Sequence, residues 1–136
     1  MAGYSGTPLA KKLGFKEGYR VGFVNPPKGF QSELGELPPN VKISISKLTK
    51  QLDLIVLFAD SRQMLRKSFP NFARKIAKSG MLWIAWPKKA SGVSTDLSEN
   101  EVREIGLRAG LVDVKVCAVN EVWSGLKFVY RLADRK

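Results

Sequence analysis

The sequence reads LIVLFA over Leu54–Ala59 and MLWIAW over Met81–Trp86, so both runs are apolar at every position. Continuous apolar runs of this length are typical of central strands in a parallel sheet, covered by helices on both faces. Between them, a hydroxyl cap predicts a helix over Ser61–Lys78, kinked or restarted at Pro70 and closed at Ser79-Gly80. Two strands joined through a helix form the unit from which parallel sheets are built.

The chain upstream of these runs continues the alternation of strand and helix. We expect a short helix over Thr7–Leu13, because a hydroxyl cap precedes a proline at the first helical position. A short strand over Tyr19–Val24 follows and ends at Asn25-Pro26-Pro27, since proline cannot donate to a strand ladder. Helical spacing of apolar residues over Phe30–Leu37 predicts another short helix. Alternating apolar and polar residues over Val41–Ile45 predict a strand at the edge of the sheet.

The downstream part predicts one more helix and two closing strands. Ser98 and Glu101 have the spacing of a capping box, which starts a helix that runs to Ala109. The segments Leu111–Val119 and Leu126–Leu132 then read as strands, joined by Asn120–Gly125. Too few residues separate these two strands for a crossover helix, so they should pair antiparallel.

The sequence therefore predicts a single α/β domain over residues 1–136, with a three-layer, Rossmann-like sheet. Most of the sheet is parallel, and the closing antiparallel pair is the ending expected of the class I methyltransferase fold. A flavodoxin-like order is the alternative, but it would require another helix before the last strand.

Charge is the strongest indication of a partner. The chain has 23 Lys and Arg residues against 12 Asp and Glu residues, a net charge of +11. This charge lies in residues 1–95, with 16 basic and 5 acidic side chains, whereas residues 96–136 have 7 of each. A basic surface favours polyanions, so the expected partners are an anionic small molecule or nucleic acid. A basic domain with neither partner remains an alternative, and the oligomeric state is not predicted.

Several classes of protein are excluded or disfavoured by composition. The absence of histidine excludes Ser-His-Asp and Cys-His nucleophiles and the common zinc sites, so no metal is expected. Cys117 is the only cysteine, so an intramolecular disulfide cannot form and a reducing cytoplasm is expected. No apolar run approaches the length of a membrane span, and the N-terminus has no secretory apolar region, so no membrane association is expected.

Three segments carry a family resemblance: GYSGTPLAKKLG near the N-terminus, then MLWIAWPKKASGVSTDLSEN, then LVDVKVCAVNEVWSGLKFV. They resemble a bacterial family catalogued as domain of unknown function 3052, and WPKKASGVSTDL is the most specific part. The resemblance implies a small cytoplasmic protein with a methyltransferase-like Rossmann sheet. It implies no established reaction.

Ligands of open α/β sheets bind beyond the carboxyl ends of the strands. In a methyltransferase, the segment after the first strand would be a glycine-rich cofactor loop, whereas this chain has Val24-Asn25-Pro26-Pro27-Lys28-Gly29. The strand at 41–45 would be followed by an acidic residue for the ribose hydroxyls, and here Ser46 and Lys47 follow. We therefore expect no cofactor and no tight binding of S-adenosylmethionine.

The segment Pro87–Gly92 is the best single candidate for a ligand site. Lys88 and Lys89 place two ammonium groups beside the turn of Ser91, which could hold an anion. The alternative is an ordinary solvated loop, because the helix that follows begins with carboxylates that would repel an anion.

The remaining candidates each have a structural alternative. Asp60 and Arg62 follow a central strand and could bind a ligand, or this segment could simply cap a helix. Trp86 ends its strand and Trp123 is expected in a loop, so either could stack on a ligand or pack on the core. Asn25 precedes the two prolines, which we interpret as a rigid turn.

Three functions remain open from the sequence. The leading hypothesis is a non-catalytic or degenerate binding domain for an anionic ligand at the carboxyl edge of the sheet. The first alternative is a methyltransferase with an atypical cofactor loop, and the second is a basic nucleic-acid-associated protein.

Overall fold

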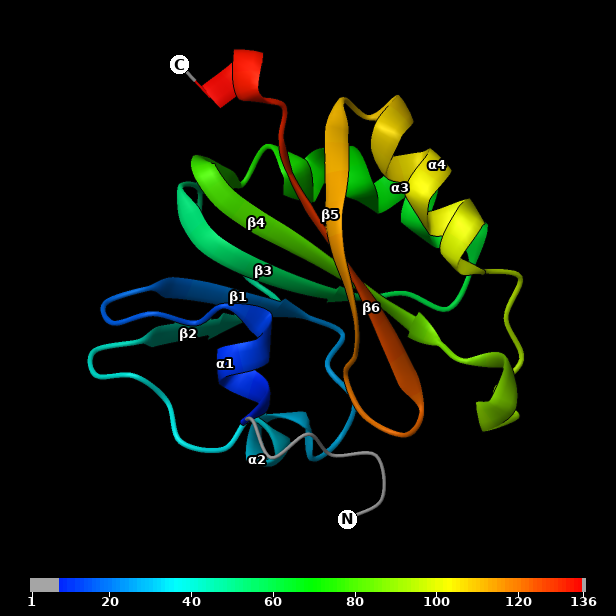
Figure 1. Ribbon diagram of the computed structural model, residues 1–136, viewed down its shortest axis with the longest axis horizontal. Helices are drawn as coiled ribbons and strands as arrows, with labels where there is room; N and C mark the ends of the chain where they lie inside the picture. The colour runs from blue at the N-terminus through cyan, green and yellow to red at the C-terminus, as the bar shows by residue number, and fades with distance from the viewer. Residues whose placement is uncertain (1–7, 136) are drawn as a thin grey trace.

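A computed structural model describes residues 8–135, whose strands form one sheet in the order β2-β1-β3-β4-β6-β5 (Figure 1). Neighbours among β2, β1, β3 and β4 pair parallel, whereas β6 runs antiparallel to both β4 and β5. The strands are β1 (Arg20–Val24), β2 (Lys42–Ile45), β3 (Leu52–Phe58), β4 (Ile76–Pro87), β5 (Leu111–Ala118) and β6 (Trp123–Tyr130).

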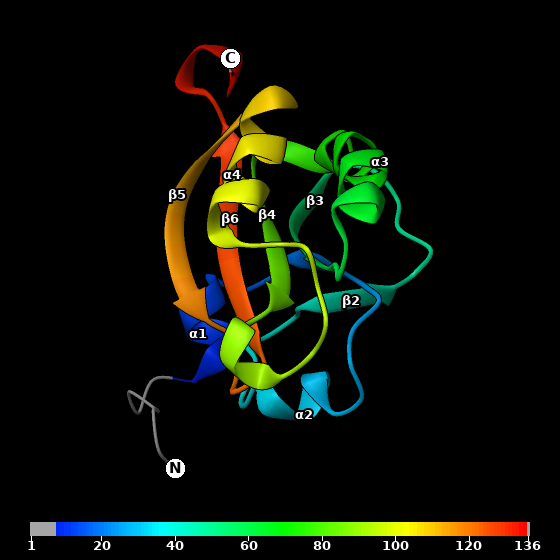
Figure 2. The same ribbon diagram turned by 90° about the vertical axis from the view of Figure 1, so that its right-hand side faces the viewer.

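Helices cover both faces of this sheet, which gives three layers. In Figures 1 and 2, α3 and α4 lie together on one side, and α1 and α2 lie on the other. The core is divided accordingly, with one apolar cluster beneath α3 and α4 and another beneath α1 and α2. The helices are α1 (Leu9–Leu13), α2 (Phe30–Glu33), α3 (Arg62–Ala73) and α4 (Glu99–Arg108), with 3₁₀ turns η1 (Lys89–Ser91) and η2 (Leu132–Arg135).

The apolar runs take the predicted central positions. Leu54, Ile55, Val56 and Leu57 of β3 and Ile84 of β4 are all fully buried. The alternating segment forms β2 at one edge, and the closing pair is antiparallel as expected. The predicted α/β class, mostly parallel with a C-terminal antiparallel pair, is therefore confirmed.

Two predicted helix caps are also present. The Oγ of Ser61 accepts a hydrogen bond from the backbone N–H of Met64 at 3.2 Å, and the Oγ of Ser98 accepts one from Glu101 at 3.4 Å. The cap predicted at Thr7 lies outside the described residues. Of the helices in residues 8–135, none has both the length and the apolar character to cross a membrane.

The prediction of a helix up to Lys78 was wrong. The helix α3 passes through Pro70 but ends at Ala73, and β4 already begins at Ile76. The backbone N–H of Leu52 donates to the carbonyl of Lys75 at 2.9 Å. The chain from Lys75 onward therefore pairs with β3 instead of continuing the helix. Gly80 sits inside this irregular strand, where a Cβ would lie 2.9 Å from the Leu52 carbonyl oxygen.

The prediction of a loop at Trp123-Ser124-Gly125 was also wrong. These residues form the start of β6, where Trp123 pairs with Pro87 and Ser124 with Trp86 of β4. Strand β5 pairs with the same segment from the other side. Hydrogen bonding on both sides therefore extends the strand, and the connecting turn is confined to residues 119–122.

The first two connections of the sheet contain little helix. Between β1 and β2 the only helix is the single turn of α2, and between β2 and β3 the segment 46–51 contains no helix. The carboxyl edge beside β1 and β2 is therefore built mainly from loops.

Candidate functional site

Loops from four parts of the chain meet at the carboxyl edge of the sheet. The turn between β5 and β6 lies there because β6 runs antiparallel to β4 (Figure 1). The backbone N–H of Lys88 donates to the carbonyl of Val122 at 2.8 Å, and the side-chain amide of Asn120 donates to a carboxylate oxygen of Glu33 at 3.0 Å. These bonds join the segment after β4 and the last residue of α2 to one turn.

Lys88 is a structural link in this assembly. Its side chain is half-buried, and the Nζ donates to the backbone carbonyl of Asn120 at 2.7 Å. The predicted anion site used the ammonium groups of both Lys88 and Lys89, but the ammonium of Lys88 already binds a protein oxygen, because the turn between β5 and β6 folds over it. Lys89 is exposed, as expected.

The hydroxyl and backbone N–H groups of Ser91 also form hydrogen bonds within the protein. Its Oγ donates to the carbonyl of Lys88 at 2.6 Å and accepts from the N–H of Val93 at 3.2 Å. The N–H groups of Ser91 and Gly92 donate within the same turn, to Lys88 and Lys89. The donors expected to cradle an anion here therefore stabilise η1 instead.

Arg62 connects α3 to the start of α4. Its backbone N–H donates to Asp96 Oδ1 at 2.8 Å, and its guanidinium lies 3.4 Å from Asp96 Oδ2 and 3.5 Å from Glu101 Oε2. The backbone hydrogen bond from Arg62 is the main reason that the pKa of Asp96 lies below its ordinary value. Sequence reasoning missed Asp96, since the contact joins residues 34 positions apart.

Asp60 is an exposed carboxylate that follows the central strand β3. Its side chain is exposed, and its backbone carbonyl accepts a hydrogen bond from the Thr95 hydroxyl at 2.6 Å. The adjacent residue that caps α3 is Ser61, in line with the structural alternative for this segment.

The two candidate tryptophans pack on opposite faces of the sheet. Trp86 is 5% exposed and belongs to the cluster beneath α3 and α4. Trp123 is half-buried on the other face and meets the ring of Phe58 edge-on, with centroids 5.2 Å apart. Phe30 meets Phe58 in the same way at 4.8 Å. These contacts make both tryptophans part of the core packing.

A hollow of about 330 Å³ lies at the loop that leaves β1. Lys28 is exposed at this hollow, and Asn25 beside it is also exposed and has a left-handed backbone with φ of 54°. Neither Asp60 nor Lys88 lines the hollow, which is formed by Pro26, Pro27, Lys28, Gly29, Phe30, Gln31 and Ser32.

The residues around this hollow do not fit a nucleotide cofactor in the usual mode. That mode uses a glycine-rich turn, the N–H groups of a long helix and an acidic residue after the second strand. Here two prolines remove N–H donors, and the N–H of Phe30 at the start of the one-turn α2 donates to Pro27. Ser46, exposed and left-handed with φ of 70°, stands where the acidic residue would be.

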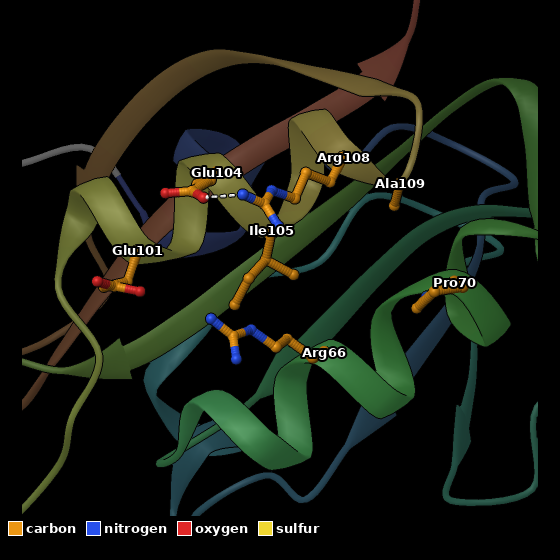
Figure 3. Close-up of a pocket in the computed structure, with 7 residues that line it drawn as sticks. All are labelled: Arg66, Pro70, Glu101, Glu104, Ile105, Arg108 and Ala109. Atoms are coloured by element: carbon orange, nitrogen blue, oxygen red, sulfur yellow. Dashed lines mark ion pairs between the residues drawn. The ribbon is translucent and has the colours of Figure 1, made fainter.

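A second hollow, of about 190 Å³, lies between α3 and α4 (Figure 3). Arg66 points from α3 towards Ile105, while Glu104 and Arg108 of α4 form an ion pair at 2.8 Å. Its walls come from the two helices rather than from the strand ends, so it is separate from the carboxyl edge.

Comparisons with known proteins identify the fold. No protein-family model and no curated protein matches the sequence, so the family resemblance stays a prediction. Among solved structures, a possible exported protein from Bordetella parapertussis matches with a TM-score of 0.64 and 10% identity, over 90% of this chain and 65% of that one. The chain therefore spans about two thirds of the length of that protein.

Two methyltransferases match over most of both chains. A SAM-dependent methyltransferase from Aquifex aeolicus has a TM-score of 0.60 and 19% identity, over 87% of this chain and 85% of that one. A TehB-like SAM-dependent methyltransferase from Corynebacterium glutamicum has a TM-score of 0.57 and 14% identity, over 96% and 91%. With its strand order, this chain has a methyltransferase-like, Rossmann-like fold.

Proposed function

We propose that this chain is a degenerate, non-catalytic member of the methyltransferase fold that binds an anionic ligand at its carboxyl edge. The observation that carries the proposal is the loop after β1, where two prolines and an exposed lysine take the place of a glycine-rich cofactor turn. A cytoplasmic location, expected from the single cysteine, is part of the same proposal.

The proposed ligand position is the hollow beside Lys28. Its ammonium is exposed, whereas Lys88 and Arg62 are already bound to oxygen atoms of the protein. A lysine bound to a phosphate or carboxylate makes a charge-assisted hydrogen bond, which contributes about 1.5–3 kcal/mol. Lys28 is therefore the best remaining cation for such a ligand, with exposed Lys89 as the second candidate.

The chemistry available at this edge favours binding over catalysis. Asp60 is exposed, whereas carboxylates that act as general bases are activated by burial and by neighbouring groups. The chain has no histidine to take that role. The proposal therefore assigns no proton transfer to the described residues.

The second candidate is a SAM-dependent methyltransferase with an atypical cofactor loop. It is favoured by the likeness to two SAM-dependent methyltransferases over most of the chain. Those identities are low, and the loop after β1 and the end of β2 lack the cofactor features, so this candidate ranks second.

Titrations followed by amide NMR separate the two candidates. S-adenosylmethionine and inorganic pyrophosphate are each added to the wild-type chain, Lys28→Ala and Lys67→Ala, the last being an exposed lysine on α3. We expect pyrophosphate to shift the amides of residues 25–32 in the wild type and Lys67→Ala, and about tenfold more weakly in Lys28→Ala.

S-adenosylmethionine is expected to leave these amides unchanged at micromolar concentrations. A low-micromolar dissociation constant, which corresponds to about −8 kcal/mol, would overturn the proposal and favour the methyltransferase. Pyrophosphate shifts that are absent, or equal in wild type and Lys28→Ala, would remove the assigned ligand site.

A further inference from the structure

Four lysines gather on the α1 side of the sheet, away from the carboxyl edge. Lys115 of β5 pairs directly across the strands with Lys127 of β6. The Nζ of Lys115 lies 3.4 Å from the backbone carbonyl oxygen of Lys12, at the end of α1. Figure 2 shows the end of β5 beside α1, and the segment that follows α1 contributes Lys16. We call Lys12, Lys16, Lys115 and Lys127 the lysine face.

Carboxylates do not neutralise this face. Among residues 8–135, no ion pair includes any of the four lysines, whereas arginines pair with carboxylates on the α4 side. Burial lowers the pKa of Lys127, and the nearby charges of Lys115 and Lys16 lower it further. Like charges opposite each other on a strand pair destabilise the fold, so the arrangement has an energetic cost that a bound polyanion would remove.

The side chains near this face suit phosphate better than an apolar partner. The partner of Val116 across the strands is Leu126, which belongs to the cluster beneath α3 and α4, so Val116 lies on the opposite side of β5 from the lysines. Beneath the lysines, Cys117 is half-buried. The aliphatic stems of the lysines can cover the apolar surface around Cys117 while their ammonium groups stay in water.

The exposure of aromatic side chains indicates which form of nucleic acid a protein surface can bind. Proteins that bind single strands usually stack bases on exposed aromatic rings. Within residues 8–135, every aromatic side chain is buried or half-buried. Lysine ammonium groups donate hydrogen bonds but accept none, so they match the phosphate oxygens of a duplex. Recognition of duplex RNA also uses the 2′-hydroxyl, which is a donor as well as an acceptor, and these four lysines offer no acceptor for it.

We propose that the lysine face binds the phosphate backbone of double-stranded DNA, without sequence specificity. The site is distinct from the hollow beside Lys28, so it does not depend on the function proposed above. Contacts to four phosphates would make the logarithm of the association constant fall with the logarithm of salt concentration at a slope of about −3.6.

The test measures binding of mixed-sequence duplex DNA by fluorescence anisotropy, between about 50 and 200 mM salt. Lys115→Gln/Lys127→Gln removes two charges and keeps much of each lysine stem. Lys42→Gln/Lys50→Gln is the matched control, because it removes two charges from exposed lysines on β2 and the turn after it. Lys12→Gln/Lys16→Gln alters the same face without touching a strand.

We expect both lysine-face variants to bind DNA about tenfold or more weakly at low salt, with slopes shallower by about 2. The matched control should bind within about twofold of the wild type. If Lys115→Gln/Lys127→Gln is unfolded by circular dichroism, Lys12→Gln/Lys16→Gln decides the outcome.

Three results would overturn the proposal. The first is no binding at about 50 mM salt, and the second is equal weakening by the control and the lysine-face variants. The third is tighter binding of duplex RNA, phosphatidylserine vesicles or a polyglutamate peptide than of duplex DNA. None of these results would change the pyrophosphate titration at residues 25–32, so the two proposals fail separately.

Discussion

Lys88 follows β4 and Lys127 lies in β6, and both side chains are half-buried, but their surroundings differ. The ammonium of Lys88 donates to the carbonyl of Asn120 at 2.7 Å, and the loop of Lys88 is bound to the same turn through its backbone. Lys127 faces Lys115 across the strands, and its pKa is lowered by burial and by like charges. At Lys88, a hydrogen bond therefore offsets the cost of burying the ammonium group. At Lys127, the neighbouring positive charges add to that cost.

This difference separates structural charge from charge that is available to a partner. At the carboxyl edge, Lys88, Ser91 and Arg62 bind oxygen atoms of the protein, which stabilises the loops. On the lysine face, Lys115 and Lys127 pair across the strands, and no ion pair among residues 8–135 includes either lysine. The Nζ of Lys115 contacts a protein oxygen only at 3.4 Å, on an exposed side chain. Three substitutions and one pH dependence test this contrast, and they follow from the largest expected effect to the smallest.

Trp123→Ala should cause the largest loss of stability, because it removes a ring that packs on Phe58 at the structured carboxyl edge. Trp→Ala substitutions in protein cores cost about 3–5 kcal/mol, and the half-buried position places this one near 3 kcal/mol. Urea unfolding followed by circular dichroism measures the change. Trp123→Phe should recover most of the loss, and a loss below about 1 kcal/mol would mean that the ring is free to serve a ligand.

Lys88→Met should lower the free energy of unfolding by about 1–3 kcal/mol. The substitution keeps the apolar stem but leaves the carbonyl of Asn120 without its charged donor. Lys89→Met is the control, since Lys89 is exposed and its change should stay within about 0.5 kcal/mol. Equal effects of the two substitutions in urea unfolding would contradict the structural role of Lys88.

Lys127→Gln should have the opposite sign and raise stability by about 0.2–1 kcal/mol. It removes one of two like charges placed directly across the strands. The gain should shrink as salt is raised, because ions screen the repulsion. Calorimetric melting at low and high salt measures both effects, and a destabilised variant at low salt would show that Lys127 is compensated by its surroundings.

Much of the fold follows from local patterns. The apolar runs at Leu54–Ala59 and Met81–Trp86 predict two central strands, and the hydroxyl groups of Ser61 and Ser98 predict two helix starts. These features depend on neighbouring residues alone, so one sequence carries them. The start of β4 at Ile76 and of β6 at Trp123 depends on pairing with distant strands, which no local pattern records.

The candidate site was harder to predict for the same reason. Lys88 and Arg62 were selected for their charge and position, and their partners Asn120 and Asp96 lie more than 30 residues away. The pairing of Lys115 with Lys127 depends on an irregular register near Asp113, so their spacing in the sequence gives no indication of it. Composition predicted a polyanion partner, but only the fold assembles the lysine face.

The smallest effect we expect is the pH dependence that Lys127 gives to stability. Its pKa in the folded chain lies below the ordinary value of 10.5, so between these two values the unfolded chain holds more protons on this lysine. Stability from this group therefore rises with pH through that window and stays constant below it. Burial raises the pKa of the Cys117 thiol above its ordinary value of 9.0, so there the folded chain holds more protons and stability falls as pH rises.

Because the two groups oppose each other, the comparison belongs in a Cys117→Ala background. Urea unfolding is measured at intervals from about pH 8 to pH 10.5, with and without Lys127→Gln. The stability advantage of Lys127→Gln should be largest at the lowest of these pH values and shrink as Lys127 loses its proton. An advantage that stays constant, or grows with pH, would mean that Lys127 titrates as an ordinary surface lysine, and the contrast with Lys88 would then rest on hydrogen bonding alone.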